Sequence, residues 1–366
     1  QGWPHMLGQG AVAGAFEHQV HLAERHPVHR LRTAGQRLAH LRQARRGHHH
    51  VRDAHAGRRL QVVTFDERQA HTANHDANVD QALYADLNAA SEAIWARSYG
   101  QHPGLSVEVL REVGSTNTAL MARARTPDVG PTLLTAVRQT AGRGRQGRVW
   151  QAQAGQCLTF SLGLPMRLEH IPGGGSALSL AVGLALAQSI DAACQQLGLT
   201  APLTQLKWPN DLWWQQRKLG GVLIEATASP HLPPDQRWVV IGVGLNITPA
   251  TDLPQSASLS EAWPSDRPPL RPGQVWPWLA SELLDAVRRF ELTGFAPLQA
   301  AYEARDGLQN QSVYLWTHAH AQPGVDAPQQ EGRAVGVNQQ GGLLVHTDGQ
   351  IQTWTTGDVT VRLTSN

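Results

Sequence analysis

Lysine is almost absent from this chain of 366 residues. Of its 31 basic residues, 29 are arginine, and the two lysines are Lys207 and Lys218. An ammonium and a guanidinium differ in geometry and hydration, so one does not simply replace the other. Two lysines within twelve residues of each other therefore indicate a site that requires an ammonium group. Chance clustering of two rare residues is the alternative.

Cysteine and long apolar runs are also scarce. The two cysteines, Cys157 and Cys194, lie far apart in the sequence. This excludes a disulfide framework and a cysteine-rich metal site, and it fits a reducing cytoplasm. No uninterrupted apolar run reaches the roughly 18 residues of a membrane span, and residues 1–10 lack the pattern of a signal peptide. We therefore expect a cytoplasmic protein that does not enter a membrane.

Acidic residues are scarce in the first part of the chain. Residues 1–75 contain 11 Arg, no Lys and 5 Asp or Glu, a net charge of +6, whereas the remainder has 20 basic and 24 acidic residues, a net −4. The same segment holds 12 of the 18 histidines, and its apolar periodicity is weak. We expect residues 1–80 to be a basic, histidine- and arginine-rich segment that is disordered or non-native, with a degenerate small domain as the alternative. The mildly acidic remainder argues against general nucleic-acid binding.

From residue 81 onward the pattern becomes that of a globular protein. Helices are predicted at Leu83–Ala96, Asn117–Arg125, Leu178–Leu197, Trp276–Leu292 and Pro297–Arg305. Strands are predicted at Val107–Leu110, Leu133–Val137, Leu158–Leu164, Leu206–Trp208, Leu219–Glu225 and Val239–Leu245, and a loop at Leu253–Pro272. Residues 81–306 are thus predicted to form an α+β domain.

A second domain is predicted over residues 307–366. Its short strand candidates are Ser312–Trp316, Arg333–Val337, Gly342–His346, Ile351–Trp354 and Val359–Leu363. Asp348-Gly349 and Gly357-Asp358 are turn sequences between them. Closely spaced strands of this kind indicate a small β-barrel.

The run Gly142–Arg148 reads Gly-Arg-Gly-Arg-Gln-Gly-Arg and follows a predicted strand. Its glycines let the backbone approach a ligand closely, and its arginines suit phosphates and carboxylates. It lacks the Gly-Lys-Ser/Thr end of a Walker loop. The run predicts an anion site, with a solvated basic loop and an RGG-like nucleic-acid contact as alternatives.

Other motifs are weaker when each is taken alone. Lys207–Leu212 is typical of a turn between strands, or else it places an amide and a carboxylate near metal-bound phosphates. In the second case Lys218 would enter the same pocket, and Gly220-Gly221 would leave space for a flat ligand. Gly114–Asn117 is typical of a helix cap. Gly242–Asn246 is a glycine-interrupted strand, which indicates a close ligand or backbone approach, or a bulge.

Taken together and in this order, the motifs resemble those of the biotin–protein ligases. The agreement covers Ser-Thr-Asn at residues 115–117, the run from Gln139 to Trp150, Lys-Trp-Pro-Asn-Asp-Leu, Arg-Lys-Leu-Gly-Gly-x-Leu-x-Glu ending at Glu225, and Gly-x-Gly-x-Asn ending at Asn246. The resemblance implies a catalytic domain related to class II aminoacyl-tRNA synthetases and lipoate ligases, with a mixed sheet and helices. It also implies that residues 307–366 form the family's SH3-like barrel.

The resemblance further implies roles for individual residues. The catalytic residues would be Lys218, Arg143 and Arg145. The biotin-binding residues would be Ser115, Thr116, Asn117, Gln139, Gly142, Arg143, Gly144, Arg145 and Lys218. The ATP-binding residues would be Arg148, Asn210, Asp211, Asn246 and Arg362, and Asp211 would also be a ligand of Mg²⁺.

The implied reaction uses biotin and ATP, with Mg²⁺, to make a biotinyl-adenylate. Biotin would then pass to a lysine of the biotin carboxyl carrier domain of acetyl-CoA carboxylase or a related carboxylase. A lipoate or octanoyl ligase of the same fold and a biotin-responsive DNA-binding repressor are the alternatives. Residues 1–80 show no convincing helix-turn-helix, so specific DNA binding is not expected, and a homodimer is left open. Residues 256–258 lack the tryptophan that some relatives place over the adenine.

Overall fold

The computed structural model describes residues 67–98, 100–199, 204–249, 256–316, 326–355 and 360–364. Most of the predicted N-terminal segment, up to residue 66, therefore lies outside the described residues. Its last part is helical, because helix α2 spans Glu67–Ser98 and contains the helix predicted at Leu83–Ala96. Leu87, Ala90 and Ile94 of this helix are buried. Helix α2 is thus part of the packed body of the protein.

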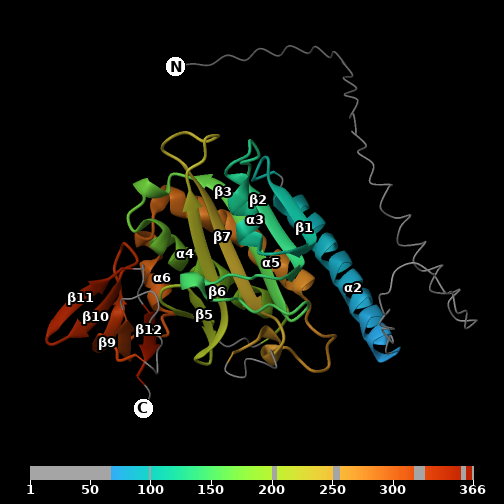
Figure 1. The fold of residues 1–366 in the computed structure, drawn as a ribbon. Helices are drawn as coiled ribbons and strands as arrows, with labels where there is room; N and C mark the ends of the chain where they lie inside the picture. Colours follow the sequence, from blue (N-terminus) through green and yellow to red (C-terminus); the bar gives the residue numbers. More distant parts are fainter. Residues whose placement is uncertain are drawn as a thin grey trace, which may run out of the picture. The chain divides into compact units, whose positions relative to one another are not determined.

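A seven-stranded mixed sheet forms the centre of the larger domain (Figure 1). Its strands are β1 (Ser106–Val113), β2 (Thr132–Gln139), β3 (Cys157–Met166), β4 (Gln205–Lys207), β5 (Asp211–Trp214), β6 (Arg217–Thr227) and β7 (Arg237–Asn246). They lie in the order β1-β2-β3-β7-β6-β5-β4, with β1 and β2 parallel and the other neighbours antiparallel. The predicted strands are confirmed. Strand β5 was not predicted, because it is short and directly follows a sequence that is typical of a turn.

Helices cover both faces of this sheet. Helices α2, α4 (Gly174–Gln196) and α5 (Pro272–Thr293) pack together on one face, and α3 (Thr116–Arg123) packs on the other. Strand β7 serves both cores: Val239 and Ile241 join the large core, whereas Trp238 and Val240 join the small core around α3. This alternation follows from the two-residue period of a strand.

Helix α4 is strongly apolar along its length. It is the one helix among the described residues that is long and apolar enough to cross a membrane, with a mean hydropathy of 1.6. However, 89% of the relevant window is buried inside the protein. Helix α4 packs against strand β6 and helix α5, and a helix that is apolar on all sides and enclosed in this way is a core helix.

Short helical turns and helix ends differ from the predictions in detail. The described turns are η1 (Arg145–Gly147), η2 (Leu168–His170), η3 (Leu259–Ala262) and η4 (Ala296–Leu298). Turn η3 lies inside the loop predicted at Leu253–Pro272, of which residues 253–255 are outside the described residues. Helix α5 begins at Pro272, before the predicted Trp276, because proline is well suited to the first turn of a helix.

Helix α6 (Gln299–Glu303) leads into a five-stranded antiparallel sheet (Figure 1). Its strands are β8 (Ser312–Trp316), β9 (Gln330–Val337), β10 (Leu343–Thr347), β11 (Gln350–Trp354) and β12 (Thr360–Leu363), in the order β11-β10-β9-β8-β12. The predicted turn at Asp348-Gly349 is confirmed, since both residues have positive φ. The turn predicted at Gly357-Asp358 lies outside the described part of the chain. The Trp208 indole N–H donates to the carbonyl oxygen of Gly341 at 3.0 Å, which ties this sheet to the larger domain.

Candidate active site

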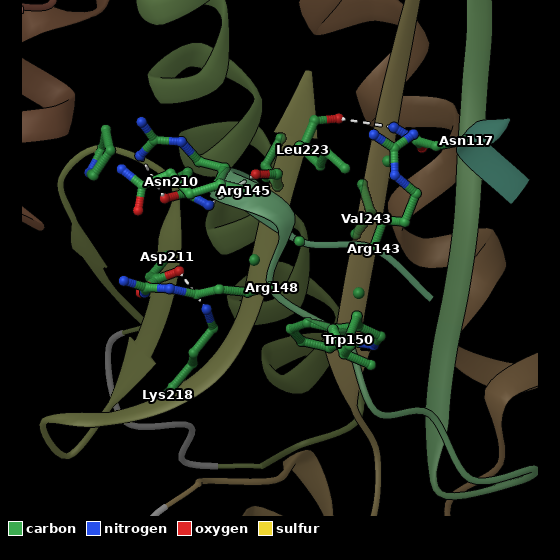
Figure 2. Close-up of a pocket in the computed structure, with 18 of the residues that line it drawn as sticks. Asn117, Arg143, Arg145, Arg148, Trp150, Asn210, Asp211, Lys218, Leu223 and Val243 are labelled. Atoms are coloured by element: carbon green, nitrogen blue, oxygen red, sulfur yellow. Dashed lines mark hydrogen bonds and ion pairs between the residues drawn. The ribbon is translucent and has the colours of Figure 1, made fainter. Parts of the chain in front are cut away.

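A cavity of about 1010 Å³, counting its open mouth, lies over strands β6 and β7 (Figure 2). Its lining comes from the start of α3, the loop between β2 and β3, strands β5 to β7, and strand β12 of the C-terminal sheet. Figure 2 shows Asn117 and Arg143 on one side of the cavity, and Asp211 and Lys218 on the other. The separate motifs of the sequence therefore meet at one place.

One end of the cavity is a buried polar cluster at the start of α3. Ser115 caps the helix through its side chain. The backbone N–H and the hydroxyl of Thr116 donate to Gln139 Oε1, at 2.7 and 3.1 Å. The Ser161 hydroxyl lies 2.7 Å from Thr116 Oγ1 and 2.6 Å from Asn117 Oδ1. Because these groups hold one another in place, this end presents a rigid polar surface to a small ligand.

The glycine- and arginine-rich loop folds back on itself over the cavity. The backbone N–H of Gly144 donates to the carbonyl oxygen of Arg148 at 2.8 Å, and that of Trp150 donates to Gly142 at 3.0 Å. At the tip, Gly147 has a φ of 72°, which glycine adopts without strain. A Cβ atom on Gly142 would lie 2.4 Å from the Trp150 carbonyl oxygen. Gly142 therefore permits the fold of the loop and is not itself among the lining residues.

Two arginines connect this loop to the strand side of the cavity. Arg143 Nη2 lies 2.9 Å from Glu225 Oε1. Arg145 Nη1 donates to Asn210 Oδ1 at 3.3 Å, and the Asn210 amide donates to the carbonyl oxygen of Val222 at 2.9 Å. The loop is thus held down by polar contacts at two points.

Both lysines of the chain lie next to one carboxylate. Lys218 Nζ is 2.6 Å from Asp211 Oδ1, and Lys207 Nζ is 3.9 Å from Asp211 Oδ2. Burial raises the pKa of the Asp211 carboxyl, but the charges of Lys218 and Lys207 outweigh burial, so this pKa lies below its ordinary value. Burial lowers the pKa of Lys207 to about 8, although Asp211 opposes the change. The lysine pair predicted from its rarity is therefore an interacting group.

Two further arginines face the cavity from the loop and from the C-terminal sheet. These are Arg148 and Arg362 of strand β12. Burial, and then the neighbouring charge of Arg148, lower the pKa of Arg362. The lining contains six basic residues, and Asp211 is its one acidic residue. This end of the cavity therefore attracts an anion with several charges.

Comparison with known proteins identifies the family to which this chain belongs. Residues 109–246 match the biotin/lipoate A/B protein ligase family. The chain is 33% identical over 266 residues to the bifunctional ligase/repressor BirA of Escherichia coli (strain K12), which covers 72% of this chain and 76% of that protein. The chain belongs to the biotin/lipoate A/B protein ligase family.

Further similarities support the membership of this ligase family. Residues 326–362 match the biotin protein ligase C-terminal domain. The biotin–[acetyl-CoA-carboxylase] ligase of Mycobacterium tuberculosis is 39% identical over 148 residues, which is 40% of this chain and 51% of that one. The structure of the biotin protein ligase from Aquifex aeolicus in complex with biotin and ATP has a TM-score of 0.54 at 24% identity, covering 71% of this chain and 99% of that chain. That structure shows that the fold is the same.

Most of the site residues predicted for this ligase line the cavity. They are Ser115, Thr116, Asn117, Gln139, Arg143, Gly144, Arg145, Arg148, Asn210, Asp211, Lys218 and Arg362. Asn246 does not line the cavity. Its amide donates to the carbonyl oxygens of Ala257 at 3.0 Å and Lys218 at 3.4 Å, so it supports the backbone that carries Lys218.

The residues at the ligase site that were not predicted include Lys207, Trp150 and Glu225. Lys207 and Trp150 line the cavity, and Glu225 binds Arg143 behind the lining. All three are part of the motifs, but their positions depend on tertiary structure. Trp150 lies against Gly244 of strand β7, where a Cβ atom would be 2.4 Å from Trp150 Cε2, whereas a Cβ atom on Gly242 would be 2.2 Å from Asn117 Oδ1. The glycines of this strand were predicted to admit a ligand or another backbone, but in the structure they admit the side chains of Trp150 and Asn117.

The ligase site does not form a metal site by itself. Within the described ranges, no group of three or more His, Cys, Asp or Glu side chains could hold an ion. Both carboxylate oxygens of Asp211 face lysines. Magnesium commonly binds through one or two carboxylates together with substrate phosphates. An Mg²⁺ ion at this site would therefore arrive as part of the nucleotide substrate.

Proposed function

We propose that this ligase activates biotin with ATP as biotinyl-5′-AMP and then transfers biotin to a lysine of a biotin carboxyl carrier domain. The carboxylase would be acetyl-CoA carboxylase or a related enzyme. The observation that carries the proposal is the pairing of a rigid, buried polar end with a basic end in one cavity. A neutral polar ring fits the first end and a triphosphate fits the second, and similar proteins are named as biotin ligases.

The first step joins two anions. A carboxylate oxygen of biotin attacks the α-phosphorus of ATP, and the bond from that phosphorus to the pyrophosphate oxygen breaks. Negative charge then collects on the phosphoryl oxygens. Lys218 and Arg145 lie where they can offset it, and one such contact in a water-poor site contributes about 3 kcal/mol.

The second step releases AMP. The uncharged amine of the carrier lysine attacks the acyl carbon, the bond from this carbon to the phosphate oxygen breaks, and the amine gives up a proton. Before this step the adenylate must be kept from water, which a loop that closes over it achieves. The loop contacts of Arg143 and Arg145 suit this task.

The positions of these residues in the cavity support the individual roles that the family resemblance implies. The polar cluster of Ser115, Thr116, Asn117 and Gln139 would bind the biotin ring, and Gly144 would let the loop backbone approach it. The ATP phosphates would be bound by Arg148, Asn210, Arg362 and the lysine pair. Asp211 would help to hold magnesium bound to these phosphates, and the ion would reduce their charge.

Other parts of the proposal extend beyond the site. The helices and mixed sheet support kinship with class II aminoacyl-tRNA synthetases, and the family match of residues 326–362 supports an SH3-like origin for the C-terminal sheet. The E. coli relative is named as a repressor as well as a ligase. Residues 1–66 lie outside the described part of this chain, so the absence of specific DNA binding stays a prediction. The cytoplasmic location also stays a prediction, and a homodimer is left open.

Incubation with biotin, ATP, Mg²⁺ and a carrier domain, followed by avidin blotting, tests this function. Biotin should appear on the carrier only when ATP is present. A thermal-shift comparison of biotin with lipoate separates the two branches of the family. Stabilisation by lipoate alone would contradict the proposal and favour a lipoate ligase.

A further inference from the structure

We infer that Glu225 is a positioning residue that links the biotin end of the cavity to the loop that closes it. Its carboxylate lies behind the lining and contacts one residue from each part: Asn117 of helix α3 and Arg143 of the loop. The inference rests on the proposed function, because it assigns to Glu225 the retention of the adenylate.

The first contact fixes the orientation of a buried amide. Asn117 Nδ2 donates to Glu225 Oε2 at 2.9 Å and to the Leu223 carbonyl oxygen at 3.4 Å. Asn117 Oδ1 lies 2.6 Å from the Ser161 hydroxyl. Both N–H groups of this amide are therefore used within the protein. Any ligand at this end meets the Asn117 amide in a single orientation, which Glu225 helps to set.

The second contact brings the loop to the same carboxylate. Arg143 Nη2 lies 2.9 Å from Glu225 Oε1, and Arg143 Nη1 donates to Glu225 Oε2 at 3.3 Å. The Arg143 side chain is 48% exposed and that of Glu225 is 20% exposed. The more exposed partner belongs to the loop, so the loop can leave while the acid stays in place.

These two contacts have different chemistry, and this allows them to be separated. A glutamine at position 225 can still accept a hydrogen bond from Asn117 through its amide oxygen. It cannot form an ion pair with Arg143. Glu225→Gln thus keeps the hydrogen bond to Asn117 at the biotin end and weakens the contact with Arg143 of the loop.

The experiment measures the rate at which preformed biotinyl-adenylate leaves the enzyme. In Glu225→Gln this rate should rise about fivefold, the size expected for a half-exposed ion pair, with a smaller effect on the KM for biotin. Arg143→Gln should give a similar increase. Because both variants break the same contact, the double variant should release the adenylate no faster than either single one. Additive effects, or a wild-type release rate in Glu225→Gln, would overturn the inference.

Controls separate this outcome from general damage and from failure of the proposed function. Glu169→Gln removes a comparable ion pair with Arg237, outside the cavity lining, and should leave release unchanged. If Glu225→Gln does not fold, Arg143→Gln and the salt dependence remain: salt should speed release from wild type and have less effect on Arg143→Gln. An equal salt effect in both would refute the link. If wild type makes no adenylate, the proposed function fails instead.

Discussion

Lys218 combines two properties: it is ion-paired to the partly buried carboxylate of Asp211, and its own side chain is 42% exposed and lines the cavity. Lys218→Ala should fold normally but lose about a hundred- to a thousandfold in adenylate formation, because it removes a charge from the α-phosphate. Pyrophosphate release in the presence of biotin and ATP measures this. Arg217→Ala is the matched control, because Arg217 pairs with Glu261 and does not line the cavity. Near-wild-type release by Lys218→Ala would rule out the role.

Lys207 gives the site a dependence on pH. Its pKa is about 8 in the folded protein, against an ordinary value of 10.5. Between these values the unfolded chain binds the proton and the folded chain does not, so the free energy of unfolding of the empty enzyme should increase with pH across this range. The charge that attracts ATP is lost over the same range. The KM for ATP should therefore rise above a pH of about 8.

Measuring the KM for ATP and the melting temperature from about pH 7 to about pH 9.5 tests this titration. Lys207→Gln has no titrating group at position 207, so its KM for ATP should be higher than that of wild type and should change less with pH. The same pH profile in wild type and variant would assign the effect to another group.

Many individual residues that line the candidate site could be predicted from the sequence alone. Lys218 and Arg143 stand out because a lysine in an arginine-rich chain, or an arginine between two glycines, is an unusual local choice. Glu225 and Asn246 could not be placed in the same way. Their contacts span 82 and 28 residues along the chain and depend on how distant strands pair.

At the scale of elements, the loop between β2 and β3 should control leakage of the adenylate. Arg145→Ala removes the contact to Asn210 and should let the intermediate escape. In a mixture that lacks a carrier domain, the variant should attach biotin to bystander proteins such as serum albumin. Avidin blotting of such mixtures checks this, and tighter retention of the adenylate in the variant would contradict it.

Strand β7 depends on its glycines to accept the side chains that lie on it. Gly244→Ala would place a methyl group 2.4 Å from Trp150 Cε2, so the indole must move and carry the loop with it. Overpacking of this kind costs about 1–3 kcal/mol. We expect a lower melting temperature and weaker binding of both substrates. Gly114→Ala is the control, since a Cβ atom there meets nothing within 4 Å, and equal effects in the two variants would argue against the explanation.

Helices and strands with a clear apolar periodicity were predicted well. Elements that are defined by pairing with distant strands were not. Helix α4 and strand β7 carry long apolar patterns, so both were found. Strand β5 has four residues and is defined by pairing with β4 and β6, which a local pattern does not report. Helix α2 was predicted too short, because its first half lacks the apolar periodicity that marks the second.

For the whole molecule, helix α2 determines how many N-terminal residues can be removed without loss of stability. A chain that starts at Glu67 should keep the melting temperature and the activity of the full chain. Starting at Leu83 removes the Asp80–Arg138 pair and the Gln81–Arg111 hydrogen bond, each worth up to about 1 kcal/mol at the surface. Starting at Gly100 also removes Leu87 and Ile94, and loss of a fully buried side chain costs about 2–5 kcal/mol.

Melting curves and carrier biotinylation of the three truncated chains provide the test. The order of stability should be Glu67, then Leu83, then Gly100, with the last chain failing to fold. A large loss already at Glu67 would show that residues 1–66 contribute to folding, against the prediction from their composition.

The scarcity of lysine also limits how far the enzyme can be acylated by its own adenylate. An acyl-adenylate labels any amine that it meets, and an enzyme is the protein nearest to its own escaping product. Here one lysine is buried and the other is bound to a carboxylate inside the cavity, and the sequence contains no third. The guanidinium groups that cover the rest of the chain stay protonated and are poor nucleophiles. A leaky variant of this ligase should therefore label its neighbours heavily while remaining nearly unlabelled itself.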